Sequence, residues 1–155
     1  MDIVRSACCT ILAVWLALPF AGWAGNCSGT NFNSTTHWEE VEIGKGSKVA
    51  THRHTSTIRS DDTSAPYHMA SGECVGAYLI GADGRMQGSG SCARADKDGD
   101  VLYEEWVMPS GTALEGTWRI VGGTGKFAKA TGNARWEASL LGPKSAAVRW
   151  SGQCD

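Results

Sequence analysis

The sequence predicts an all-β domain: an antiparallel, closed β-barrel of about eight strands, with glycine-rich turns and two disulfides. Short runs of alternating apolar and polar residues are separated by glycine turns, which is the pattern of strands. Four cysteines follow an N-terminal export signal, and no convincing helical stripe occurs outside that signal. Regularly spaced short strands are typical of a sandwich or barrel, and closure removes exposed strand edges.

Residues 1–24 have the pattern of a cleaved signal peptide. Arg5 precedes an apolar run over residues 7–20, and the small residues Gly22 and Ala24 suit a signal peptidase site. The run is shorter than the roughly 20 residues that a membrane span needs. We therefore predict cleavage after Ala24, with the bond after Gly25 as second choice and an uncleaved anchor as the alternative. The expected location is the periplasm or the extracellular space.

The remaining residues, 25–155, are long enough for a single domain with a substantial core. The chain has a formal net charge of −2, and the signal peptide, with one acid and one base, does not alter it. Such a charge offers no positive surface for nucleic acid or an anionic membrane. We therefore expect no nucleic-acid partner, and no membrane contact after signal cleavage. The oligomeric state stays open.

Eight stretches carry the strand pattern, and turn residues such as glycine, aspartate and proline separate them. These stretches lie at 36–43, 48–59, 71–81, 85–94, 100–108, 116–121, 131–141 and 146–153. At most a single helical turn is expected, at residues 126–130. The sequence therefore predicts strands that pair with their neighbours through short hairpins.

The cysteine positions favour one of the three possible pairings. Cys74 and Cys92 lie symmetrically about Asp83, which stands in a turn signal, so a hairpin there places them opposite each other. By elimination, Cys27 pairs with Cys154 and ties the first mature strand to the last. A metal site is the rival interpretation, but no CxxC-type pair occurs among these four cysteines.

Tryptophans indicate which faces of the later strands point inward. They share their faces with aliphatic residues, whereas the opposite faces carry Glu105, Arg119, Arg135, Glu137 and Arg149. The simplest interpretation is a packed core with a charged outer face. The more specific interpretation is a cavity for an apolar or aromatic ligand. An eight-stranded barrel is compatible with either interpretation. The predicted ligand-binding residues are Trp106, Trp118, Trp136 and Trp150.

Three residues are candidates for catalysis. Glu104 lies on the predicted inward face, where a carboxylate must be paired, protonated or functional. Tyr78 can contribute an oriented hydroxyl, and His68 is a candidate general acid or base. The sequence lacks a Gly-x-Ser-x-Gly elbow and a free cysteine nucleophile.

Two histidines suggest an alternative that uses a metal. His52 and His54 are two residues apart and so share a strand face; with a third histidine and Glu104 or Glu40 they could hold zinc or iron. Such pairs are common by chance on exposed strands, and we expect no metal and no cofactor. The acidic segment 96–100 also departs from the EF-hand pattern, so it is expected to be a turn.

Residues 118–132, Trp-Arg-Ile-Val-Gly-Gly-Thr-Gly-Lys-Phe-Ala-Lys-Ala-Thr-Gly, resemble the strand–turn–strand signature of the allene oxide cyclase barrel-like superfamily, which includes plant dirigent proteins. The arrangement of glycines and cysteines over 72–76, 90–92 and 98–100 looks like exported bacterial proteins of this type. The resemblance implies an eight-stranded antiparallel barrel with an apolar pocket. Family members steer the cyclisation or radical coupling of small apolar substrates. The matched residues form a turn, so the resemblance assigns no catalytic residue.

Taken together, these patterns predict an exported barrel that binds a small apolar or aromatic molecule in a Trp-lined cavity. Control of that molecule's cyclisation, isomerisation or coupling is the activity expected if the protein is an enzyme. One alternative is a non-catalytic structural or interaction module with a filled barrel. Another is a metal-dependent enzyme that uses His52 and His54.

Overall fold

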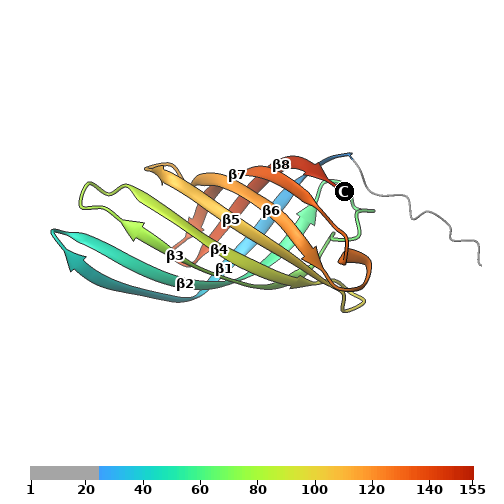
Figure 1. The fold of residues 1–155 in the computed structure, drawn as a ribbon, viewed down its shortest axis with the longest axis horizontal. Coiled ribbons are helices and arrows are strands. Elements are labelled where there is room, and N and C mark those ends of the chain that lie inside the picture. Colours follow the sequence, from blue (N-terminus) through green and yellow to red (C-terminus); the bar gives the residue numbers. More distant parts are fainter. Residues whose placement is uncertain (1–24) are drawn as a thin grey trace, which may run out of the picture.

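The protein forms one closed antiparallel β-barrel, seen here in a computed structural model (Figure 1). The structure describes residues 25–155, so the predicted signal peptide lies outside the described residues. Each strand pairs with its neighbours in chain order, and the last strand pairs with the first. The strands are β1 (Gly25–Gly44), β2 (Ser47–Ser60), β3 (Ser71–Ile80), β4 (Met86–Ala95), β5 (Val101–Gly111), β6 (Glu115–Gly123), β7 (Gly132–Gly142) and β8 (Ser145–Cys154). The predicted fold class is confirmed.

The first strand is much longer than the predicted 36–43. Its inward positions before residue 36 carry polar or small side chains, including Cys27, Asn31 and Asn33, so no apolar alternation marks it in the sequence. A register shift between Thr35 and His37 then changes which residues face inward. Among described residues, no helix is long and apolar enough to cross a membrane.

One end of the barrel is packed. The loop between β2 and β3 folds over this end, and its residues Tyr67 and Ala70 are buried against Leu102, Phe127 and Trp150. The loop is held by backbone hydrogen bonds, such as the one from the Met69 amide to the Ile58 carbonyl at 2.7 Å.

The glycine-rich turn 122–125 and a single 3₁₀ turn, Gly125–Phe127, lie at the packed end, not beside the cavity described below. The Lys126 ammonium donates to the carboxylates of Asp96 (2.5 Å) and Asp98 (2.6 Å) in the neighbouring β4–β5 turn. Asp96 also accepts the backbone amides of Asp98 and Asp100. The acidic segment is therefore a turn closed by a lysine.

Both predicted disulfides are confirmed. Cys27–Cys154 joins β1 to β8 at the packed end. Cys74 and Cys92 lie directly opposite each other on β3 and β4, and their disulfide forms part of the barrel wall. The second bridge stands about a third of the way along these strands from the packed end, at the level where the packed core gives way to the cavity.

Candidate functional site

The other half of the barrel encloses a cavity of about 430 Å³. It extends to the hairpin ends of the strands, where the lining residues Trp38 and Leu140 are 44% and 72% exposed. The cavity therefore opens to solvent at this end, while the packed core closes the other. This volume lies in the range of small-molecule sites. A filled barrel, which the interaction-module alternative predicts, would have no such cavity.

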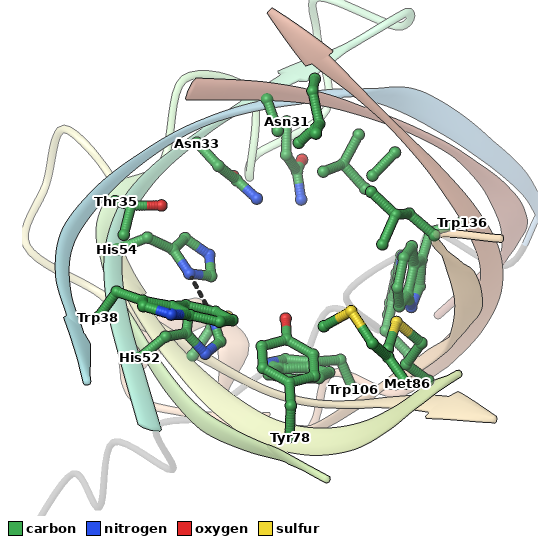
Figure 2. Close-up of a pocket in the computed structure, with 18 of the residues that line it drawn as sticks. Asn31, Asn33, Thr35, Trp38, His52, His54, Tyr78, Met86, Trp106 and Trp136 are labelled. Atoms are coloured by element: carbon green, nitrogen blue, oxygen red, sulfur yellow. Dashed lines mark hydrogen bonds between the residues drawn. The ribbon is translucent and has the colours of Figure 1, made fainter. Parts of the chain in front are cut away.

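Aromatic rings form one wall of the cavity (Figure 2). Trp38 from β1, His52 from β2, Tyr78 from β3 and Trp106 from β5 lie side by side in space. The ring centroids are 5.6 Å apart for Trp38 and Tyr78, 5.0 Å for His52 and Tyr78, and 5.5 Å for Tyr78 and Trp106. These separations are typical of favourable aromatic pairs, so the rings support one another as a stacking surface.

Glycines on neighbouring strands make room for this wall. Gly88 pairs directly with Tyr78, and Gly90 pairs directly with Trp106. A Cβ atom at either glycine would overlap the ring of its partner. Because Gly88 and Gly90 have no side chains, the rings of Tyr78 and Trp106 can lie against the barrel wall.

Two histidines and Tyr78 supply uncharged polar groups at the aromatic wall. A hydrogen bond of 2.9 Å joins His52 Nε2 to His54 Nδ1, and the two rings stack with centroids 4.9 Å apart. Burial lowers the pKa of His54 to about 3 and also lowers the pKa of His52, so both imidazoles are neutral near pH 7. Burial raises the pKa of Tyr78 to about 12, so its hydroxyl, which points into the cavity in Figure 2, stays a hydrogen-bond donor.

A buried ion pair lies on the cavity wall at the border of the packed core. Arg94 on β4 pairs with Glu104 on β5, and the two residues are only 3% and 6% exposed. Arg94 Nη2 also donates to Ser56 Oγ (3.1 Å) and approaches Cys74 Sγ (3.4 Å). Burial lowers the pKa of Arg94 to about 9, which leaves the guanidinium charged at neutral pH. Glu104 therefore faces inward, as the sequence predicts, and is paired.

The wall opposite the histidines is apolar. Figure 2 places Trp136 and Met86 across the cavity from His54, Asn33 and Thr35. Other apolar side chains complete this wall: Ile80, Met108, Leu114, Ala138, Leu140, Ala146 and Val148. The cavity is thus amphipathic, with uncharged polar groups mainly from β1 to β3.

The predicted site residues do not all meet in this cavity. Trp106, Trp118, Trp136, Tyr78 and Glu104 line it. Five of the seven predicted catalytic and ligand-binding residues thus come together from four strands, β3, β5, β6 and β7.

The other two predicted residues lie elsewhere. Trp150 is 3% exposed in the packed core below the cavity, where its indole donates to Asn31 Oδ1 (2.9 Å) and its ring lies against that of Trp118. His68 stands in the β2–β3 loop, with Nδ1 3.2 Å from the Ser60 carbonyl, and is not among the lining residues.

Sequence reasoning missed several lining residues. Trp38 faces inward only because the register shift in β1 moves it there, and nothing in the local sequence marks that shift. The inward position of Arg94 could have been predicted, because it is two residues from Cys92 on the same strand and therefore shares its face.

The histidine pair is arranged differently from a metal site. The His52 and His54 nitrogens that face each other are hydrogen-bonded together. Within residues 25–155, the group of three potential ligands that lie close enough for one ion is His54, Cys74 and Cys92, and the two cysteines form a disulfide. The pair therefore acts as a polar, neutral part of the cavity wall.

Comparisons with known proteins support the fold. No protein-family model matches the sequence, and no curated protein matches it. The structure is similar to the pterocarpan synthase dirigent protein GePTS1, with 16% identity, a TM-score of 0.52 and 84% of each chain covered. It is also similar to a pyocyanin demethylase, with 13% identity and a TM-score of 0.50 over 83% of this chain and 99% of that one.

A protein with unknown function from Clostridium acetobutylicum is a further structural neighbour, with 9% identity and a TM-score of 0.58 over 84% of this chain and 97% of that chain. The chain therefore has the eight-stranded barrel fold of dirigent proteins. The resemblance seen in the turn at residues 118–132 is confirmed at the level of fold.

Proposed function

We propose that this protein binds a small, uncharged, planar aromatic molecule in the barrel cavity and steers its cyclisation, isomerisation or coupling. The observation that carries the proposal is the open cavity of about 430 Å³ with a wall of adjoining aromatic rings. A planar ligand gains both apolar burial and ring stacking on such a wall.

The charges around the cavity favour an uncharged ligand. Among the described lining residues, the charged side chains are Glu40, Arg94 and Glu104. Glu40 is paired with Lys48 at 2.7 Å, and Arg94 is paired with Glu104. A charged ligand would lose hydration on entry without gaining a free counter-charge.

The polar wall supplies groups that can orient such a ligand. The Tyr78 hydroxyl donates a hydrogen bond to a ligand oxygen, and the neutral His52–His54 pair offers both a donor and an acceptor. The apolar wall restricts how the ligand folds. Reaction control in this proposal comes from holding one conformation and keeping water away.

Two further features support the proposal. The structural neighbours include a pterocarpan synthase and a pyocyanin demethylase, each named for a small molecule. The signal-peptide pattern and the two disulfides support export to an oxidising compartment. If cleavage follows Ala24, mass spectrometry of the exported protein should give the mass of a chain that begins at Gly25.

Tryptophan fluorescence tests ligand binding, because Trp38, Trp106, Trp118 and Trp136 line the cavity. We expect quenching or a spectral shift with neutral two- or three-ring aromatics, and a weaker response to their carboxylated analogues.

Tyr78→Phe should weaken binding of a ligand that accepts a hydrogen bond by about 3- to 10-fold. Tyr103→Phe is the matched control, since Tyr103 is exposed on the outer face of β5.

Two results would contradict the proposal. One is a folded protein that gives no response to any member of the panel. The other is equal weakening by Tyr78→Phe and Tyr103→Phe, because the outer tyrosine does not contact the cavity.

A further inference from the structure

The two disulfides stand in different surroundings. Cys27–Cys154 lies within the apolar cluster at the packed end, together with Ile58, Leu102 and Ile120. Cys74–Cys92 lies in the wall of the cavity, and Cys92 is one of the residues that line it. A small molecule that enters the cavity therefore reaches the second bridge and not the first.

Polar side chains surround the second bridge. The strand registers place His54 opposite Cys74, Cys74 opposite Cys92, and Cys92 opposite Glu104, so these residues form one row across β2 to β5. A ring nitrogen of His54 lies within 4.8 Å of both sulfur atoms. Arg94 Nη2 is 3.4 Å from Cys74 Sγ.

These groups match the requirements of thiol–disulfide exchange. The reaction is faster when the sulfur that leaves is stabilised as a thiolate, and a neighbouring cation provides that stabilisation. Arg94 is in this position toward Cys74 through Nη2, while its Nη1 pairs with Glu104.

We propose that Cys74–Cys92 is a redox-active disulfide that oxidises a small organic thiol within the cavity. A first thiol enters the cavity in its neutral form, releases its proton to water and attacks Cys92 Sγ as the thiolate; the Cys74–Cys92 bond breaks, and Cys74 leaves as a thiolate beside Arg94. A second thiolate attacks the small-molecule sulfur of the mixed disulfide and releases Cys92. The products are one small-molecule disulfide and two cysteines, which take up two protons from water.

The redox proposal requires an open cavity but not an aromatic ligand. Failure of the fluorescence titration therefore leaves it intact, and failure of the experiment below leaves aromatic binding intact. The Cys27–Cys154 bridge provides an internal comparison in the same molecule.

The experiment treats the folded exported protein with increasing 2-mercaptoethanol, quenches the reaction, alkylates free thiols and maps them by peptide mass spectrometry. Circular dichroism follows the fold in parallel. We expect Cys74 and Cys92 to be alkylated while Cys27 and Cys154 remain joined and the β signal persists. One equivalent of oxidised 2-mercaptoethanol should form for each barrel.

Variants test the route and the role of the cation. Ala138→Phe narrows the cavity and should slow reduction of Cys74–Cys92 without affecting the other bridge. Arg94→Met combined with Glu104→Gln removes the guanidinium without leaving an unpaired carboxylate, and should slow the same step on the order of tenfold.

Some outcomes overturn the proposal. They are equal reduction of both bridges, earlier reduction of Cys27–Cys154, or reduction that occurs only as the β signal is lost. If the double variant does not fold, the comparison of the two bridges in the native chain and in Ala138→Phe still decides the question.

Discussion

Burial of neutral polar side chains gives the cavity its character at the level of single residues. His52 and His54 hold each other through a hydrogen bond, and the buried Arg94–Glu104 pair cancels its own charge. Each pair joins two buried polar side chains to each other, which offsets part of the cost of burying them. The charged side chains of the cavity wall are thus paired within the protein, and this is the basis for expecting an uncharged ligand.

The low pKa of His54 makes stability depend on pH. The folded-state pKa is about 3, below the usual 6.5, because burial disfavours the imidazolium and His52 and Arg94 add to the effect. In acid the unfolded chain binds a proton that the folded chain does not, so this contribution is complete above about pH 6.5 and is lost as the pH falls toward 3. At about 1.4 kcal/mol per pKa unit, this pKa shift contributes at most several kcal/mol to the free energy of unfolding.

Urea denaturation of the wild type and His54→Gln at pH 7 and pH 4.5 measures this effect. The difference in unfolding free energy between the two pH values should be smaller in the variant. His37→Gln is the control, since His37 is exposed beside Glu39. An unchanged pH dependence in His54→Gln would show that this histidine does not carry the linkage.

At the level of elements, aromatic rings and glycines are matched across neighbouring strands. Tyr78 faces Gly88, Trp106 faces Gly90, Trp136 faces Gly116 and Trp150 faces Gly29. In each pair a Cβ atom on the glycine would collide with the partner ring. The glycines on inward positions thus determine where large rings fit inside the barrel.

Substitution of one of these glycines tests the pairing. Gly90→Ala should destabilise the fold by ~1–3 kcal/mol, because the added methyl group displaces the Trp106 ring. It should also change the emission of the cavity tryptophans. Ser89→Ala on the exposed face of the same strand should stay within ~0.5 kcal/mol in guanidinium denaturation. Equal effects of the two substitutions would contradict the pairing.

The whole molecule is a barrel with one packed half and one hollow half. The packed half contains Leu102, Ile120 and Phe127 under the β2–β3 loop, and the chain ends are joined there by Cys27–Cys154. The strands extend beyond this core toward the open end, where β1 and β2 form the longest hairpin in Figure 1. A rigid base of this kind can hold the cavity open without a ligand.

The two disulfides should stabilise the barrel to different degrees. They close chain segments with sequence separations of 127 and 18, and the chain-entropy relation gives about 5 and about 3 kcal/mol respectively. Paired Cys→Ala variants of each bridge, compared by guanidinium denaturation, measure this. A larger loss for Cys74 and Cys92 than for Cys27 and Cys154 would show that loop closure is not the dominant effect.

Local sequence patterns were enough to predict the strands from residue 36 onward and the disulfide pairing. Both follow from local rules: side chains alternate between the two faces of a strand, and Cys74 and Cys92 are equidistant from a turn. The same alternation placed Glu104 and Trp106 on the inner face, and the structure agrees.

The height of each inward side chain along the barrel, in contrast, follows from how the strands pair in three dimensions. Strands in a closed barrel are tilted, so register partners on neighbouring strands differ in height: Trp150 and Trp136 are partners, yet Trp150 lies in the core while Trp136 reaches the cavity. That height also depends on the register shift between Thr35 and His37, which places Trp38 on the aromatic wall. Register and bulges arise from pairing between distant segments, and no local pattern in the chain encodes them.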